Sequence, residues 1–190
     1  AAAAATSSLL RAGAALSVAS PDASDALRQL QTDLAALAAL VGPTTIDPAT
    51  APLVAATPNA TPVDGLVAAW TSLPPGRLAV LLFALEQVGK PYVWAAAGPD
   101  AYDCSGLMLR AFALAGVALA HFSGTQVRSG PPVTPEQIAP TDLLGFGESS
   151  TNHVEMYLGG GRTVEAKGRA WGVVVSDVDL TSASNIAHIL

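Results

Sequence analysis

Hydrophobic positions in the N-terminal third of the chain follow a helical period. Across Ser24–Val41, leucines recur at intervals of three and four residues, which places them along one face of a helix. Pro21 supplies a start signal, and Gly42–Pro43 supplies a stop. The pattern therefore predicts a helix, with the Ala-rich stretch Thr6–Ala19 as its partner in a short antiparallel hairpin.

A proline-rich stretch separates this hairpin from the rest of the chain. Residues 43–62 contain five prolines among threonine and alanine, a composition that prevents helix and sheet-ladder formation. We therefore predict two parts. Residues 1–62 form a helical hairpin and its linker, and residues 63–190 form a second domain.

The apolar pattern beyond the linker has first a helical period and then the period of strands. Helices are expected over Val63–Leu73, Arg77–Val88 and Ser105–Ala115. Five short, β-prone segments separated by turn residues are expected to be strands: Leu143–Phe146, His153–Leu158, Arg162–Ala166, Val173–Val175 and Ile186–Leu190. Helices followed by antiparallel strands predict an α+β fold.

Composition and charge narrow the classes of function. The chain of 190 residues is 51% hydrophobic with a net charge of -6, so it can bury a core but lacks the clustered Lys and Arg of a nucleic-acid surface. Polar residues or Pro interrupt every apolar stretch before the roughly 20 residues of a membrane span. The start at Ala1, without Met or a charged leader, leads us to expect a mature form whose signal peptide is absent.

The single cysteine, Cys104, is either an inert buried thiol or a nucleophile. No second Cys or Cys/His cluster has the spacing of a zinc site, so no metal or cofactor is expected. Cys104 stands at the start of a predicted helix, where free amide N–H groups and the helix dipole favour a thiolate. Asp103 fits a helix cap or a group that holds a substrate amine, and the cap is favoured.

Three histidines are candidates for the base that a thiol nucleophile needs. His188 lies close to the end of the chain and His121 lies in a loop-like stretch, so both are expected at the surface. His153 begins a predicted strand, on the same face as Glu155 and Tyr157. His153 is therefore the expected base.

A glutamate on the following strand is a candidate partner for His153. An odd-length hairpin loop centred on Gly159 would place Glu165 directly opposite His153, with Cβ atoms roughly 5 Å apart. Glu165 would then orient the imidazole while its other nitrogen faces Cys104, as in a catalytic triad. The alternative is that Glu165 and Arg162 are ordinary exposed strand residues.

Several linked motifs between Leu78 and Leu190 resemble one known family. They are Pro91-Tyr92-Val93-Trp94, Tyr102-Asp103-Cys104-Ser105-Gly106-Leu107, His121-Phe122-Ser123-Gly124-Thr125-Gln126, Pro140-Thr141-Asp142-Leu143-Leu144, and His153-Val154 leading into Tyr157-Leu158-Gly159. Together, and in this order, they resemble the NlpC-type (NlpC/p-sixty) bacterial cell-wall cysteine peptidases, in their actinobacterial form.

The resemblance implies a papain-like domain with helices on an antiparallel sheet of five to six strands. It implies a secreted peptidoglycan hydrolase of the cell wall or a periplasm-like space, a D,L-endopeptidase that cleaves stem peptides, commonly at the D-γ-glutamyl–diaminopimelate bond. Cys104 would be the nucleophile, His153 the general base and acid, and Glu165 the orienting residue. The groups expected near the oxyanion or substrate are Tyr92, Asp103 and Ser105, with a core aromatic as the alternative for Tyr92.

Three departures from the family pattern stand close to these motifs. Ala95–Ala96 occupies a place where Gly-Gly is common, and Thr141 replaces the usual Gly before Asp142. Glu155 replaces a small residue two positions after His153. We expect Glu155 to be the partner of a Lys or Arg; the alternatives are a second carboxylate near the imidazole and a group that selects substrate.

Two other functions fit the same residues. One is a non-catalytic peptidoglycan-binding module, against which the retained Cys104, His153 and Glu165 argue. The other is a papain-like amidase or acyltransferase on another amide or ester, because one centre serves all such acyl transfers.

The leucine face of the N-terminal helices needs a covering surface, so we expect these helices to dock over the groove; self-association is the alternative.

Overall fold

The computed structural model describes Thr32 and residues 63–148 and 152–190. The predicted N-terminal hairpin and proline-rich linker lie outside these residues, apart from Thr32, which is helical and exposed. Within the described parts of the chain, every helix is too short or too polar to cross a membrane.

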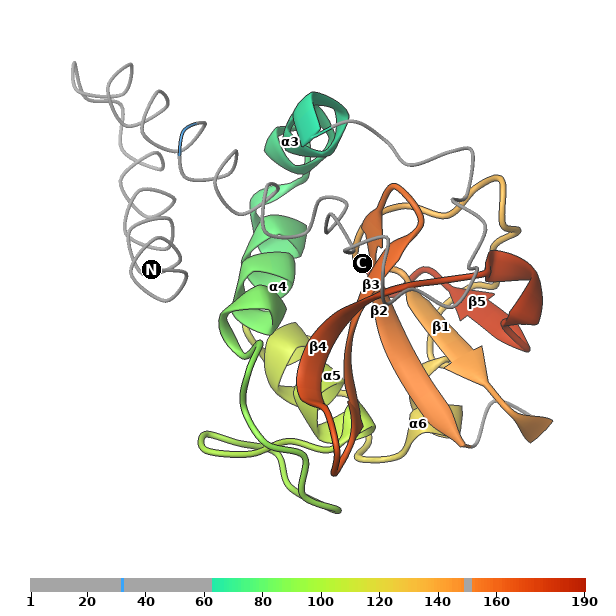
Figure 1. The fold of residues 1–190 in the computed structure, drawn as a ribbon. Coiled ribbons are helices and arrows are strands. Elements are labelled where there is room, and N and C mark those ends of the chain that lie inside the picture. Colours follow the sequence, from blue (N-terminus) through green and yellow to red (C-terminus); the bar gives the residue numbers. More distant parts are fainter. Residues whose placement is uncertain (1–31, 33–62, 149–151) are drawn as a thin grey trace, which may run out of the picture.

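The domain is built on one antiparallel sheet of five strands in the order β4-β3-β2-β1-β5 (Figure 1). The strands are β1 (Leu143–Phe146), β2 (His153–Gly159), β3 (Arg162–Gly168), β4 (Gly172–Asp177) and β5 (Asn185–Ala187). The helices are α3 (Val63–Thr71), α4 (Pro75–Glu86), α5 (Cys104–Ala113) and α6 (Ser123–Gln126), with a 3-10 helix, η2, at Leu180–Ser182. The predicted α+β fold is confirmed.

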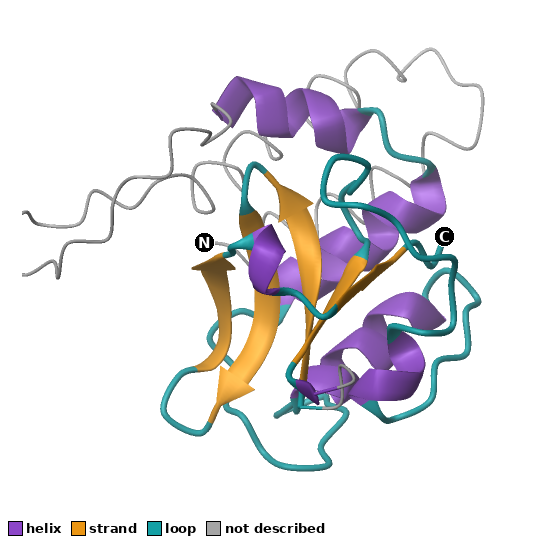
Figure 2. Ribbon diagram, turned by 90° about the vertical axis from the view of Figure 1, so that its right-hand side faces the viewer, coloured by secondary structure: helices purple, strands orange, loops and turns teal. Residues whose placement is uncertain are grey.

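The main core lies between the helices and the sheet. Figures 1 and 2 show α4 and α5 on one side of the sheet. Leu107 and Phe112 of α5 are fully buried in the same cluster as Met156 of β2. The Trp70 indole of α3 is also fully buried and donates a hydrogen bond to the Leu158 carbonyl at 2.7 Å. Helix α3, just after the proline-rich linker, is thus part of this domain.

Several element boundaries differ from those predicted. Helix α4 begins at Pro75 because a proline is tolerated in the first turn, where its missing N–H costs nothing. Strand β5 ends at Ala187 instead of Leu190 because the His188 N–H donates to the Pro131 carbonyl, away from the sheet. The turn of helix at α6 was not predicted, since a four-residue segment carries no apolar stripe.

His188 was expected at the surface, and 36% of its side chain is exposed, but its contacts with Arg77 and Asp142 were not predicted. Arg77 donates to its Nε2 at 3.0 Å, and its Nδ1 lies 2.8 Å from an Oδ1 of Asp142, a residue with no exposed surface. Arg77 also donates to Asp142 at 3.0 Å and to the Thr141 hydroxyl at 2.8 Å. The cluster ties α4, the start of β1 and the C-terminal segment together.

Candidate active site

Cys104 is the first residue of α5, and Asp103 caps the helix. The Oδ1 atom of Asp103 accepts hydrogen bonds from the Gly106 N–H at 2.6 Å and the Ser105 hydroxyl at 3.1 Å. Its Oδ2 atom accepts from the Ala95 N–H at 2.7 Å. The favoured capping role is confirmed, and the carboxylate that was the alternative holder of a substrate amine is already engaged on both oxygens.

Gly106 allows a loop to pass directly over the first turn of this helix. A Cβ atom at this position would collide with the Ala96 carbonyl oxygen. Ala95 in the same loop has a φ of 62°, a left-handed conformation that explains why glycine suits this position in the family pattern. Thr141, the other replaced glycine, has a φ of 79°. Both departures therefore keep the backbone shape without the glycine.

The β2–β3 hairpin carries His153, and the register predicted for this hairpin was wrong. Met156 pairs with Val164 and Tyr157 with Thr163, so Glu165 lies across from Glu155 and not from His153. The cause is the turn. Gly160 and Gly161, with φ values of 60° and 73°, form a two-residue turn, and an irregularity near Gly159 adds to the shift.

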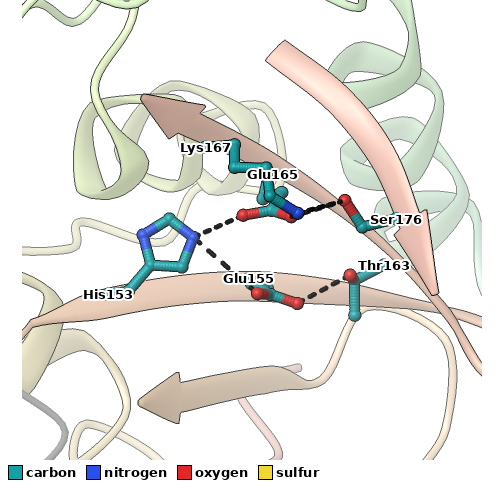
Figure 3. A network of polar contacts seen from close by, with 6 residues as sticks. All are labelled: His153, Glu155, Thr163, Glu165, Lys167 and Ser176. Atoms are coloured by element: carbon teal, nitrogen blue, oxygen red, sulfur yellow. Dashed lines mark hydrogen bonds and ion pairs between the residues drawn. The ribbon is translucent and has the colours of Figure 1, made fainter. Parts of the chain in front are cut away.

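His153 nevertheless reaches Glu165 diagonally across the two strands (Figure 3). Its Nε2 lies 2.6 Å from Glu165 Oε2, and the Glu165 residue is only 2% exposed. Glu165 Oε1 accepts hydrogen bonds from the Ser176 hydroxyl and from Lys167 at 3.2 Å. The alternative of an ordinary exposed strand residue is therefore excluded for Glu165.

The charges around His153 favour an imidazolium. Burial lowers its pKa, but hydrogen bonds with Cys104 and Glu165, and the negative charges of both, outweigh burial and raise the pKa to about 10. For Glu165, burial raises the pKa, whereas hydrogen bonds from His153 and Ser176 lower it more, so the net shift is downward. The raised pKa of His153 and the lowered pKa of Glu165 thus favour an imidazolium that is paired with a carboxylate.

Among the described residues, Glu155 does not have the Lys or Arg ion-pair partner that was expected. Its Oε2 accepts a hydrogen bond from the Thr163 hydroxyl at 2.7 Å, and its Oε1 lies 3.8 Å from His153 Nε2. The lysine nearby, Lys167, pairs with Glu165. The alternative of a second carboxylate beside the imidazole describes the observed position.

His153, Glu155 and Glu165 each offer one potential metal-ligand atom, all within 4.8 Å of one another. The 2.6 Å separation of His153 and Glu165 is that of a charge-assisted hydrogen bond. A metal ion would have to replace this bond, so the arrangement suits a shared proton better than a cation.

Cys104 opens onto a cleft of about 260 Å³. The cleft is lined by Trp94, Ala95, Asp103, Cys104, Ser105, His121, Phe122, Ser123 and Asn152. Trp94 is 75% exposed, and Phe122 is 47% exposed. The opening beside the thiol is therefore lined by two exposed aromatic rings and by several polar side chains.

His121 was expected to be an ordinary surface residue, but it lines this cleft. Its Nε2 lies 2.9 Å from Asp103 Oδ1, so it contacts the cap of the helix that carries Cys104. The buried Gln126 fixes the same loop by donating to the carbonyls of Ser105 at 2.8 Å and Ala120 at 2.7 Å. The signal that pointed to this loop was its resemblance to the Ser/Gln motif of the family.

Tyr92 is half-buried and packs against the main core. Burial raises its pKa, and the negative charges of Cys104 and Asp103 raise it further. The packing of Tyr92 fits the alternative of a core aromatic, and a role for its hydroxyl beside Cys104 stays a prediction.

The chain is similar in sequence to curated proteins that are named endopeptidases. A probable endopeptidase of Mycobacterium tuberculosis is 41% identical over 110 residues, 58% of this chain and 28% of the relative. Peptidoglycan endopeptidase RipA of Mycolicibacterium smegmatis is 38% identical over 112 residues, 52% of this chain and 22% of the relative. The chain spans less than a third of the length of either relative.

Solved structures include both antigenic and non-catalytic relatives. The P60 domain of a Mycobacterium avium subspecies paratuberculosis antigen has a TM-score of 0.56 at 34% identity, over 60% of this chain and 94% of that one. RipD of Mycobacterium tuberculosis, described as a non-catalytic NlpC/p60 domain protein adapted to peptidoglycan binding, has a TM-score of 0.55 at 30% identity, over 62% and 100%.

Three further structures are of the protein RipA mutated at a cysteine, a histidine and a glutamate. They are 28 to 30% identical to this chain, with TM-scores of 0.55 to 0.56. The mutated residues are 49 and 12 positions apart in RipA, the same separations as Cys104–His153 and His153–Glu165 here. Residues 89–186 match the NlpC/P60 family, and this chain belongs to that family.

Proposed function

We propose that this domain is a cysteine peptidase that hydrolyses peptide bonds of peptidoglycan, with Cys104, His153 and Glu165 as its catalytic residues. The observation that carries the proposal is the placement of His153, whose Nε2 lies 2.6 Å from Oε2 of the buried Glu165 and whose pKa is raised by Cys104 and Glu165. Homology to peptidoglycan endopeptidases supports a cysteine peptidase.

The geometry supplies each part of an acyl transfer. The Cys104 thiolate attacks the scissile carbonyl, and the oxyanion is stabilised by the N–H groups at the start of α5, with the Tyr92 hydroxyl nearby. The His153 imidazolium then gives its proton to the leaving amine, and a thioester remains. Neutral His153 takes a proton from water, and the hydroxide attacks the thioester and expels the Cys104 thiolate. The carboxylic acid product then leaves, and the thiolate–imidazolium pair is regenerated.

We propose the D-γ-glutamyl–diaminopimelate bond of the stem peptide, and a site of action in the cell wall after export. The cleft beside Cys104, with exposed Trp94 and Phe122, leaves room for a peptide chain.

Mass spectrometry of digested muropeptides tests this function. Wild-type protein in reducing buffer is expected to release fragments whose masses give the bond cleaved, while Cys104→Ala releases none. A product mass from another amide or ester would favour an amidase or acyltransferase. Identical digests from both proteins would contradict hydrolysis.

The second candidate is peptidoglycan binding without catalysis, which the similarity to RipD favours. Iodoacetamide distinguishes the two. A thiolate–imidazolium pair reacts at neutral pH much faster than an ordinary cysteine thiol, so ordinary reactivity of Cys104 would favour binding.

A further inference from the structure

Glu155 is a mostly buried carboxylate that the proposed reaction does not use. Its side chain is 12% exposed and lies on β2, two residues after His153. The observed register places it across from Glu165, so two carboxylates face each other on neighbouring strands. Such a pair is unfavourable unless a cation or a proton compensates it.

The orientation of Glu155 is fixed from one side. The hydroxyl of Thr163, a residue with no exposed surface, donates to Glu155 Oε2 at 2.7 Å. The other oxygen, Oε1, then lies 3.8 Å from His153 Nε2, as Figure 3 shows. This distance is too long for a hydrogen bond but short enough for a strong Coulomb interaction with an imidazolium.

The remaining charges around His153 come from α5 and β3. Cys104 lies at the start of α5, and β3 contributes Glu165 and the 42% exposed Lys167. Strand β1 contributes only the uncharged ring of Phe146, centred 6.4 Å from the imidazole. Lys167 donates to Glu165 and also lowers the pKa of Glu155 through its charge, but among the described residues the imidazole is the cationic group within ion-pair distance of Glu155.

We propose that Glu155 is a positioning residue that acts through His153, as a second carboxylate that keeps the imidazolium in place to higher pH. This positioning role rests on the proposed function only because it requires Cys104 and His153 to work as a pair. During hydrolysis of the thioester, the same charge would help neutral His153 to take a proton from water.

Glu155 can support the His153 imidazolium only while its carboxyl group is ionised, so protonation of Glu155 sets the lowest pH at which this support acts. Burial raises its pKa and the charge of Glu165 raises it further, against the hydrogen bond from Thr163 and the charge of His153. Glu155 therefore takes up a proton at a higher pH than an ordinary carboxyl, and its support of the imidazolium is lost first as the pH falls.

NMR titration of the histidine side chains tests the proposal without any substrate. In Glu155→Gln, the titration midpoint of His153 should fall by about one pH unit, within the range for a charge at this distance. Glu155→Asp should recover part of the shift. Glu136→Gln, which removes the same charge from an exposed carboxyl away from the site, should leave the midpoint unchanged.

The outcomes separate this proposal from the proposed function. If Glu155→Gln is poorly folded, Glu155→Ala provides a second variant, with a small residue of the kind usual in the family. An unchanged midpoint in a folded variant, or an altered KM with an unchanged pH profile, would overturn the positioning role. Failure of wild-type protein to cleave muropeptides would instead overturn the proposed function and leave the titration result standing.

Discussion

At the scale of single residues, Cys104 and Glu165 together decide at which pH the imidazolium of His153 is lost. The pKa of His153 is raised from 6.5 to about 10. The stabilisation that its positive charge provides is therefore fully present below the ordinary value and is lost as the pH rises through the folded value. Below neutral pH it is Glu165, with its lowered pKa, whose protonation would weaken the pair.

Glu165→Gln should show this dependence. Replacing the carboxylate with an amide removes the charge that supports the imidazolium, so we expect kcat to fall by about two orders of magnitude. The alkaline limb of the pH–rate profile should also move to lower pH. Steady-state hydrolysis of a stem peptide between neutral and alkaline pH measures both, with Glu136→Gln as the matched control. An alkaline limb in the same place as in wild type would contradict the role of Glu165.

The sequence predicted residues whose contacts are local and missed those whose partners are remote. Asp103 was identified as a cap because its contact to Gly106 lies within one helical turn. His121 and His188 lie at least partly at the surface, as expected, but their contacts were not predicted because the partners, Asp103 and Arg77 with Asp142, come from other segments. No spacing within one strand or helix encodes such contacts.

At the scale of elements, the strands were predicted more reliably than their register. Alternation with period two located β2 and β3, but consecutive glycines from Gly159 to Gly161 allow the turn to centre at more than one position. The observed turn moves Glu165 across from Glu155. The contact with His153 survives because a glutamate side chain is long enough to reach a diagonal neighbour.

The loop over the first turn of α5 contains strain that a single substitution should relieve. Ala95 has a φ of 62°, which costs a non-glycine residue about 1–2 kcal/mol, whereas glycine adds about 0.4–1 kcal/mol of chain entropy in the unfolded state. Ala95→Gly keeps the N–H that donates to Asp103. We therefore expect it to stabilise the protein by about 0.5 kcal/mol.

Urea unfolding measures this change as a higher midpoint with an unchanged slope. Ala96→Gly is the matched control, since Ala96 is not among the described residues with positive φ, and glycine there should destabilise the protein. Equal effects of the two substitutions would show that the backbone conformation of Ala95 is not strained.

At the scale of the whole molecule, the described domain holds a site whose parts come from both of its layers. Helix α5 supplies Cys104, and the sheet supplies His153 and Glu165. The packing of α5 against the sheet, through residues such as Leu107 and Met156, therefore fixes the distance between Cys104 and His153. The hydrophobic period of the sequence predicted both layers, but it could not predict how they meet.

The leucine stripe predicted over Ser24–Val41 would need an apolar surface to cover it, and the groove of the second domain is the surface that we expect. If residues 1–62 dock over the groove, a shortened protein that starts at Val63 should hydrolyse muropeptides severalfold faster than the full chain. Leu30→Glu combined with Leu34→Glu in the full chain should raise the rate in the same way, since two charges on the stripe oppose docking without removing any residue. Equal rates for all three proteins would rule out docking over the groove. A rate that depends on protein concentration in the full chain alone would instead favour self-association through the stripe.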